Sequence, residues 1–299
     1  MPVRPALVSA VLLLSVLGVS LSGPLVRLSA AHPIAIAVWR LAFSLVIVAV
    51  PLAVGGSWRQ WRSLDRTSFA FAGGAGVLLA LHFWSWNTSI GLTTIAASVV
   101  LVNVQPLVVA GLSAFWLREP PTRQQWLGIV IAMIGALVVV LPDLLSGGFA
   151  SNRSALLGDA LALVGAVTAA TYYVIGRKLR QTLDLWAYVA LVYAACLATL
   201  LLIALTLGVS LGPYPPREYG IFALLAVGPM LLGHTGMNWA LRHARAYQVN
   251  IVLLGEPIGA TLLAALLPGI RERPSPLILV GGVIVLVGIL LAERRRAHD

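Results

Sequence analysis

The amino-acid sequence predicts an all-α integral membrane protein of ten transmembrane helices, built as two inverted five-helix repeats with cytoplasmic N- and C-termini. Three observations predict this fold: the composition, the distribution of Lys and Arg between the loops, and matching positions in the two halves of the chain. Of the 299 residues, 60% are hydrophobic and 10% are charged, whereas a soluble domain has about 25% charged residues. A single soluble core cannot bury so much apolar surface, so lipid must cover the rest.

Ten apolar stretches are long enough to cross a bilayer, which requires about 20 predominantly apolar residues. They cover 6–28, 33–54, 68–88, 93–117, 123–142, 154–177, 185–207, 217–241, 245–268 and 275–292. Their apolar residues do not alternate with polar ones, as they would in the strands of a membrane barrel. The first stretch is longer than the apolar part of a signal peptide, so we expect it to be kept as a helix.

Positive charge is distributed unevenly between the two sides that ten helices define. With the N-terminus in the cytoplasm, 14 of the 20 Lys and Arg residues are cytoplasmic, and Arg40 lies inside a predicted helix. The external side has only Arg27, Arg153, Arg217, Arg271 and Arg273. Cytoplasmic loops of membrane proteins carry the excess of Lys and Arg, so the alternation supports both the orientation and the helix count. The net charge of +10 therefore reflects orientation in the bilayer and does not indicate a nucleic-acid partner.

The two halves of the chain match when the sequence is shifted by 151 residues, with two more residues inserted before the last helix. The matched pairs are Asn87 with Asn238, Gln105 with Glu256, Pro106 with Pro257, Pro121 with Pro274, Gly128 with Gly281, and Gly135 with Gly288. We therefore expect one membrane domain over 1–299, with a first repeat over 6–142 and a second over 154–292. Because the first repeat crosses the membrane five times, the second begins on the opposite side and is inverted relative to it. Two equivalent halves can open a central cavity to either side of the membrane.

Glu256 lies near the middle of the predicted helix over 245–268. A charged side chain is costly at that depth and usually faces a cavity or a partner. It is either a binding residue or a structural group that is hydrogen-bonded to neighbouring helices. If the protein exchanges protons, Glu256 is the carboxylate near the midplane that can carry them. Gln105 occupies the matching position in the first half and is a second candidate.

Prolines predict kinks in four of the helices, because a proline removes a backbone hydrogen bond and frees a carbonyl. Kinked helices at matching places in inverted repeats indicate where a ligand binds. The predicted kinks are at Pro24, Pro106, Pro229 and Pro257.

Aromatic and polar residues gather on two other predicted helices. His82 and Trp86 share a helical face with Asn87 beside them, and His234 and Asn238 lie in the mirrored region. An aromatic cavity with a few polar groups suits a small amphipathic ligand. The alternative is that the tryptophan anchors the protein at the membrane interface, but the neighbouring His and Asn would then face lipid.

Arg40 lies about seven residues inside its predicted helix, which is deeper than an ordinary flanking charge. Three interpretations remain open. Its side chain extends to the interface, forms an ion pair with Glu256, or binds a carboxylate of the ligand.

The motifs together resemble the EamA family of the drug/metabolite transporter superfamily. The residues that carry the resemblance are Trp39–Phe43, Gln105–Pro106, Leu117–Pro120 with Thr122, Gly255–Pro257 and Arg271–Arg273. The resemblance implies ten helices in two repeats, location in the bacterial inner membrane, and ATP-independent export of amino acids or other small metabolites; aromatic amino acid exporters are among the relatives. Arg118 stands where the family usually has glycine.

Two other functions compete with amino-acid export. A nucleotide-sugar or organophosphate exchanger of the same superfamily needs several cations in its cavity, and Arg40 is the only one near the midplane. An integral-membrane enzyme needs a catalytic motif, and the sequence has no His-Glu-x-x-His, no paired acidic diphosphate motif and no nucleophile elbow. The absence of a Walker loop argues against ATP-driven pumping. We therefore expect no cofactor and no metal, with a small-molecule substrate and the bilayer as partners.

Overall fold

The computed structural model describes residues 4–93, 98, 101–147, 153–266 and 276–293, and these form helices and turns without any β-strand. The α-helices are α1 (Pro5–Ser20), α2 (Ser22–Leu28), α3 (Pro33–Val54), α4 (Arg66–Leu92), α6 (Gln105–Leu112), α7 (Arg123–Gly147), α8 (Arg153–Leu179), α9 (Leu185–Thr206), α10 (Pro216–Leu225), α11 (Gly236–Ala240), α12 (Ala246–Val252), α13 (Glu256–Leu266) and α14 (Pro276–Glu293). The 3₁₀-helical segments are η1 (Ser57–Ser63) and η4 (Leu253–Gly255), and the π-helical segments are η2 (Ser113–Leu117) and η3 (Ala226–Thr235).

Among the described residues, six helices are long and apolar enough to cross a membrane, and they confirm the prediction of an all-α membrane protein. They are Pro5–Leu28, Pro33–Val54, Arg66–Leu92, Arg153–Leu179, Leu185–Thr206 and Pro216–Ala240. Shorter apolar helices at Gln105–Leu117, Arg123–Val138 and Leu279–Ala292 lie where the fourth, fifth and tenth helices were predicted. The ninth predicted helix is divided by η4 into α12 and α13. Parts of the fourth and ninth predicted stretches lie outside the described residues.

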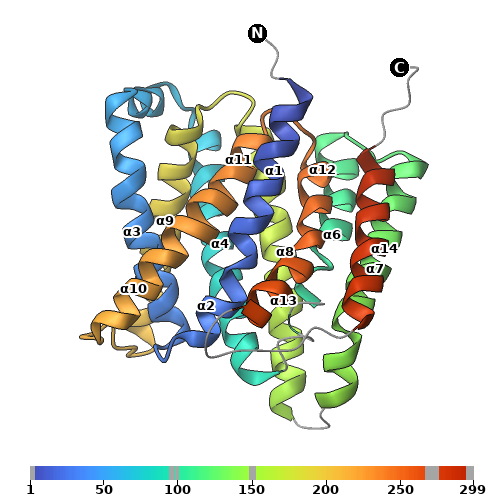
Figure 1. The fold of residues 1–299 in the computed structure, drawn as a ribbon. Helices are drawn as coiled ribbons and strands as arrows, with labels where there is room; N and C mark the ends of the chain where they lie inside the picture. Colours follow the sequence, from blue (N-terminus) through green and yellow to red (C-terminus); the bar gives the residue numbers. More distant parts are fainter. Residues whose placement is uncertain (1–3, 94–97, 99–100, 148–152, 267–275, 294–299) are drawn as a thin grey trace.

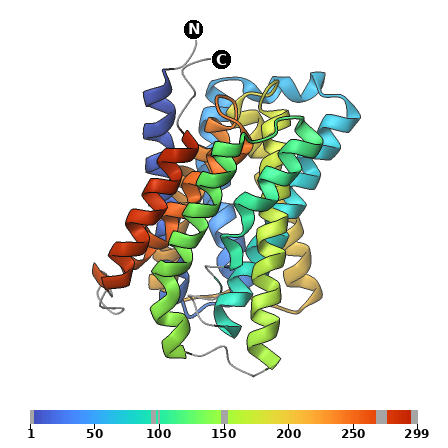
Figure 2. The ribbon, with the colours of Figure 1, turned by 90° about the vertical axis from the view of Figure 1, so that its right-hand side faces the viewer.

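The helices form one bundle, in which α1 begins and α14 ends at the same end (Figure 1). We call this the upper end, as it is drawn in Figure 1. The helix α4 packs against α8 and α9, and α1 packs against η3. On the other side of the bundle, α7 and α14 lie side by side (Figure 2). The outward faces carry large exposed hydrophobic side chains such as Val46 and Leu279, which lipid can cover.

Glycines allow α7 and α14 to touch along their backbones. A methyl group on Gly128 would lie 2.6 Å from the carbonyl oxygen of Gly288, and one on Gly135 would lie 2.8 Å from that of Gly281. Such close backbone approach through small residues is how helices associate in lipid, where apolar side chains gain little from leaving the solvent.

Each of the four prolines predicted to kink a helix lies at or beside an interruption. Pro24 follows the break between α1 and α2, and Pro106 is the second residue of α6. Pro229 lies in the π-helical η3, and Pro257 follows the 3₁₀ turn η4. A proline lacks the N–H that a continuous helix needs, so the backbone departs from α-helical hydrogen bonding there.

The backbone of Arg118 is left-handed, with a φ of 56°, and ends η2. An L-residue with a Cβ atom loses roughly 1–2 kcal/mol in this conformation, whereas glycine adopts it freely. This explains physically why a glycine suits the position that Arg118 occupies.

Replacing Arg118 by glycine should therefore raise the free energy of unfolding by about 1 kcal/mol. The measurement is unfolding of the purified protein in detergent. Arg118→Ala is the matched control, because it removes the same charged side chain but keeps the Cβ atom. Equal stabilities of the glycine and alanine variants would show that the backbone conformation is not responsible.

Candidate functional site

A cavity lies between the helices near the middle of the bundle, and both halves of the chain line it. The cavity has a volume of about 50 Å³ and is partly open to the outside. Six of the eight predicted binding residues line it, together with two of the four prolines: Arg40, His82, Trp86, Gln105, His234 and Glu256, with Pro106 and Pro229. Residues separated by up to 216 positions in the sequence therefore meet at one site.

Arg40, from α3, is almost completely buried, with 1% of its surface exposed. Its guanidinium carbon lies 4.1 Å from the centroid of the Phe83 ring. Its Nε and Nη1 atoms are buried without a hydrogen-bond partner. Buried polar atoms are nearly always hydrogen-bonded, and those of a cation are especially costly to leave unpaired. These two nitrogens therefore lack an acceptor in this structure.

Arg40 does not form an ion pair with Glu256 in this structure. The ion pairs between described residues join Arg177 to Glu119 and Arg217 to Glu218. Instead, the face of Phe83 carries the guanidinium through a cation–π contact. Arg40 and Glu256 thus line one cavity without coming within ion-pair distance of each other.

Trp86 and His82 form an aromatic wall on α4. Their ring centroids are 6.3 Å apart and their planes are inclined by 5°. Trp86 is 5% exposed, so it is a buried residue and not an anchor at the membrane interface. Its indole Nε1 is buried without a hydrogen-bond partner, as the two guanidinium nitrogens are.

His82 and His234 lie across from each other, with ring centroids 6.3 Å apart. The Nδ1 atom of His82 is 2.9 Å from the carbonyl oxygen of Gly165 on α8. The Nδ1 atom of His234 is 3.3 Å from the hydroxyl of Tyr173, whose ring is stacked on the imidazole at 7°. Each imidazole is therefore held through Nδ1, and its Nε2 has no hydrogen-bond partner among the described residues.

Gln105 connects the two halves of the chain beside the cavity. Its Nε2 donates to Oδ1 of Asn250, and the Asn250 Nδ2 donates to the Ala246 carbonyl at 2.9 Å. Glu256, the first residue of α13, accepts a hydrogen bond on its backbone oxygen from the Ser20 hydroxyl at 3.4 Å. No described residue donates a hydrogen bond to the Glu256 carboxylate.

The matched asparagines Asn87 and Asn238 are buried but do not line the cavity. Asn87 Nδ2 donates to the carbonyl of Pro33 at 3.2 Å, which joins α4 to α3. Asn238 donates to the Tyr172 hydroxyl and to the His234 carbonyl. In this structure both side chains form hydrogen bonds between helices and do not line the cavity. Pro24 and Pro257 also lie outside the cavity lining.

Sequence reasoning missed several residues of the site. Phe83 supports Arg40, Tyr173 orients His234, and Asn250 orients Gln105. Asn103 and Ser22 complete the polar part of the lining. Asn250 was the most accessible of these to prediction, because a polar residue inside an apolar stretch needs a partner.

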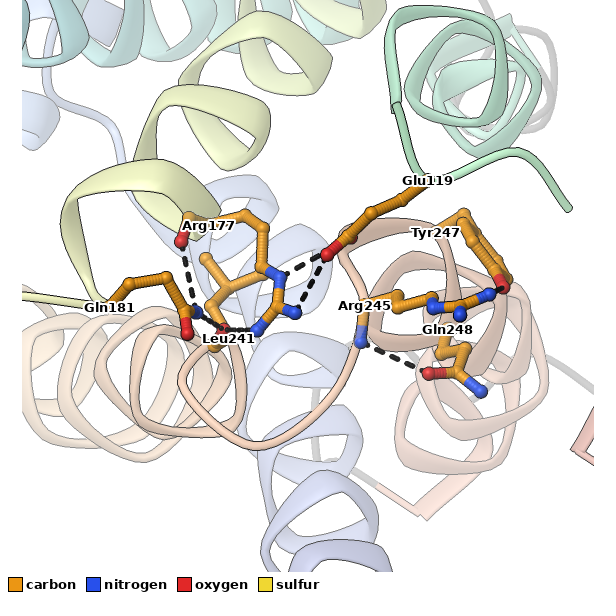
Figure 3. Close-up of polar contacts among 7 residues, drawn as sticks. All are labelled: Glu119, Arg177, Gln181, Leu241, Arg245, Tyr247 and Gln248. Carbon is orange, nitrogen blue, oxygen red and sulfur yellow. Dashed lines mark hydrogen bonds and ion pairs between the residues drawn. The ribbon is translucent and has the colours of Figure 1, made fainter. Parts of the chain in front are cut away.

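At the upper end of the bundle (Figure 1), a polar cluster joins the two halves of the chain (Figure 3). Glu119, from the turn before α7, binds Arg177 at the end of α8 through two contacts of 2.8 and 3.3 Å. Arg177 also donates to the Leu241 carbonyl at 2.8 Å. The Tyr247 hydroxyl receives a hydrogen bond from Arg245 and donates one to Gln125, each at 3.0 Å. The contacts of Glu119 with Arg177 and of Tyr247 with Gln125 therefore join the two halves of the chain at this end of the bundle.

The part of the chain that the structure describes contains no group of three His, Cys, Asp or Glu side chains that could hold a metal ion. His82 and His234 approach each other, but each is held through Nδ1 by the protein. The arrangement offers donors and acceptors to an organic ligand.

Comparison with known proteins gives consistent results. The sequence model of the EamA-like transporter family matches the chain twice, over residues 7–141 and 156–293. An uncharacterized transporter of Archaeoglobus fulgidus is 27% identical over 88% of this chain and 90% of its own length. The pseudopaline exporter CntI of Pseudomonas aeruginosa is 28% identical over 74% of both chains. A probable terminal-alkyne amino-acid exporter of Streptantibioticus cattleyicolor is 27% identical over 84% of this chain and 80% of its own. A solved crystal structure shares the fold, with a TM-score of 0.79 at 18% identity over 97% of both chains.

Proposed function

The chain belongs to the EamA-like transporter family and is a multi-pass protein of the bacterial inner membrane, and we propose that it exports amino acids with apolar side chains. Export proceeds without ATP, by alternating access of the central cavity to the two sides of the membrane. The named exporters among the relatives support the direction of transport, and one of them is named for an amino-acid substrate.

One observation carries the choice of substrate: the residues that line the cavity include two with buried donor nitrogens that have no partner, and one with a carboxylate. The donors are Arg40 Nε, Arg40 Nη1 and Trp86 Nε1, and the carboxylate is that of Glu256. A bound zwitterion would satisfy both sides, with its carboxylate on the donors and its ammonium toward Glu256. Phe83 and Trp86 then offer apolar surface to its side chain.

A sugar nucleotide or organophosphate fits the lining less well. A phosphate group carries more charge and more acceptor oxygens than a carboxylate, and proteins usually meet it with several cations. Among the described residues that line the cavity, Arg40 is the only Arg or Lys.

Transport by proteoliposomes tests the proposal. Vesicles that contain the purified protein should exchange labelled leucine and phenylalanine, with and without an imposed proton gradient, and protein-free vesicles serve as the control. A gradient that drives accumulation would assign proton coupling, for which Glu256 is the carboxylate in the cavity. Transport of phosphorylated sugars without transport of any amino acid would reject the proposal.

An inverted repeat underlies the proposed mechanism, and the packing supports it. If the two repeats are equivalent, α4 corresponds to η3, α6 to α13, and α8 to α1. The packed pair α4–α8 then corresponds to η3–α1, and α6–α8 corresponds to α13–α1. Both members of each correspondence are packed pairs. The contact of Gly128 with Gly288 corresponds in the same way to that of Gly281 with Gly135. The family model also matches each half separately.

We further propose that the upper end faces the cytoplasm and that the chain crosses the membrane ten times. Reporter fusions after Asp65, Glu119 and His298 should then be cytoplasmic, and fusions after Leu145 and Tyr214 should be external. The Lys and Arg residues of the turns at the upper end support this orientation. An external reporter after His298 would contradict the proposed topology, in which a cytoplasmic N-terminus is followed by an even number of crossings.

The Glu119–Arg177 ion pair should stabilise the state that is closed at the upper end, because it joins the two halves there (Figure 3). A partly exposed pair contributes up to about 1 kcal/mol, which corresponds to roughly a fivefold change in population. The reporter is a cysteine placed at Leu253, which lines the cavity, in a protein whose own cysteine is removed by Cys196→Ala. The rate at which a maleimide added from the upper side labels this cysteine should rise about fivefold in Glu119→Gln. The exchanged pair Glu119→Arg with Arg177→Glu should restore the original rate. An unchanged labelling rate in Glu119→Gln would show that the pair does not control opening.

A further inference from the structure

A second pocket lies on the side of the bundle, between α6, α7 and η4. We call it the side pocket. Its volume is about 320 Å³, against about 50 Å³ for the central cavity. Among the described residues that line the side pocket, Asn103 is the only one with a polar side chain. The side pocket therefore suits a hydrocarbon group and not a charged one.

The outer wall of the side pocket belongs to α7. Val130, Ile134 and Leu137 line the pocket, and they are 45%, 52% and 45% exposed. They follow one another at helical spacing, so they share the outer face of α7. In the bilayer that face meets lipid, and the side pocket is therefore apolar on its outer side as well as inside the bundle.

Two short segments of the chain separate the side pocket from the central cavity. In the segment before α6, Val102 lines the central cavity, Val104 lines the side pocket, and Asn103 lines both. In η4, Leu253 lines the central cavity and Leu254 lines the side pocket. Because consecutive residues line the two spaces, a single segment of chain forms the wall at each of these places.

The two segments of this wall occupy matching places in the two repeats. A shift of 151 residues pairs Val102 with Leu253, and both line the central cavity. It also pairs Asn103 with Leu254, and both line the side pocket. A turn precedes α6, and η4 is a 3₁₀ turn between α12 and α13. Such interruptions of a helix often mark hinges, so a movement of one half against the other can part the wall.

The central cavity is too small for a whole amino acid with a long side chain. Its volume holds roughly three to five water-sized groups, which is enough for an ammonium and a carboxylate but not for a hydrocarbon chain as well. We propose that such a chain passes Asn103 and occupies the side pocket, so that the protein favours amino acids with long, straight side chains. This inference rests on the proposed function and specifies its substrate class. The first carbons of the chain still contact Phe83 and Trp86, which line the central cavity.

Competition by a series of straight-chain amino acids tests the inference on the unaltered protein. Unlabelled norvaline, norleucine and α-aminooctanoic acid compete with labelled leucine for uptake into proteoliposomes. The inhibition constant should fall by about fourfold for each methylene group that enters the side pocket, the factor that corresponds to burial of one such group. If leucine is transported and the inhibition constant does not fall with chain length, the inference is wrong and lipid fills the side pocket, while the proposed function stands. If no amino acid is transported, the proposed function itself fails.

Tryptophan substitutions on α7 assign the effect to the side pocket. Met133→Trp fills part of the pocket, so it should remove the advantage of α-aminooctanoic acid over norvaline and leave the inhibition constant of norvaline unchanged. Ile134→Trp should do the same and is the second variant if the first does not fold. Leu127→Trp is the matched control, because it puts the same side chain on an exposed part of α7 outside both cavities, and it should change neither quantity. Long chains that merely partition into the bilayer would keep their advantage in both pocket variants, and that result would overturn the assignment.

Discussion

Replacing Arg40 by glutamine should lower the transport of every amino acid by 100-fold or more at equal amounts of protein in the membrane. Two guanidinium N–H groups have no partner in the cavity, and a hydrogen bond to a charged group contributes about 1.5–3 kcal/mol. Loss of both bonds to a substrate carboxylate would cost roughly 3–6 kcal/mol, and each 1.4 kcal/mol is a factor of ten. Arg40→Lys should recover only part of the loss, because an ammonium cannot reproduce the forked geometry.

Leucinamide distinguishes a carboxylate-binding role from a structural one. It lacks the carboxylate, so it should compete with leucine far less well than leucine itself in the unaltered protein. In Arg40→Gln this preference should disappear, because the group that reads the carboxylate is gone. If Arg40→Gln still prefers leucine to leucinamide, or if it only reduces the amount of folded protein, then Arg40 has a structural role in contact with Phe83.

The general fold was predictable because the bilayer imposes simple requirements on the sequence. Apolar stretches such as 33–54 and 185–207 became single helices with the expected bounds to within a residue or two. The ninth stretch was predicted as one helix and is divided at Leu253–Gly255, next to a proline whose kink was expected. Proline indicates where a helix is interrupted, but the neighbouring contacts decide whether the interruption is a bend, a 3₁₀ turn or a π-helical segment.

The site was predictable where a polar group is costly in lipid and unpredictable where only packing decides. Arg40, Gln105 and Glu256 stand out because charged and amide side chains near the midplane need a cavity or a partner. Phe83 and Tyr173 do not stand out, since aromatic residues are common in apolar helices. Their roles depend on which faces of α4 and α8 meet, and that is determined by the rotation of helices against each other.

The paired asparagines show the limit of matching two halves by sequence. Asn87 and Asn238 were grouped with the aromatic residues because they occupy matching positions beside them. In the structure their amides bond to the Pro33 carbonyl and to Tyr172, outside the cavity lining. A match between repeats indicates a common place in the fold, while neighbouring residues on one helix can point to different surroundings.

Trp86→Ala should weaken the transport of large apolar amino acids by about 1–3 kcal/mol, the contribution of burial and stacking of an aromatic wall, and should affect small ones much less. The reason is geometric: Trp86 is buried, lines the cavity and stands parallel to His82, so its removal leaves a void where a large side chain would pack. Uptake of labelled phenylalanine, leucine and alanine into proteoliposomes measures the difference.

Two further variants separate the aromatic wall from the polar part of the site. Gln105→Ala should weaken all three substrates alike, because the Gln105–Asn250 pair lies at the junction of the halves, near the groups that bind the common zwitterionic part. Trp116→Ala is the matched control, since this tryptophan is partly exposed beside Phe71 and away from the cavity. If Trp86→Ala lowers phenylalanine and alanine uptake equally, Trp86 acts through packing of the bundle, and the apolar part of the substrate must lie against another wall of the cavity.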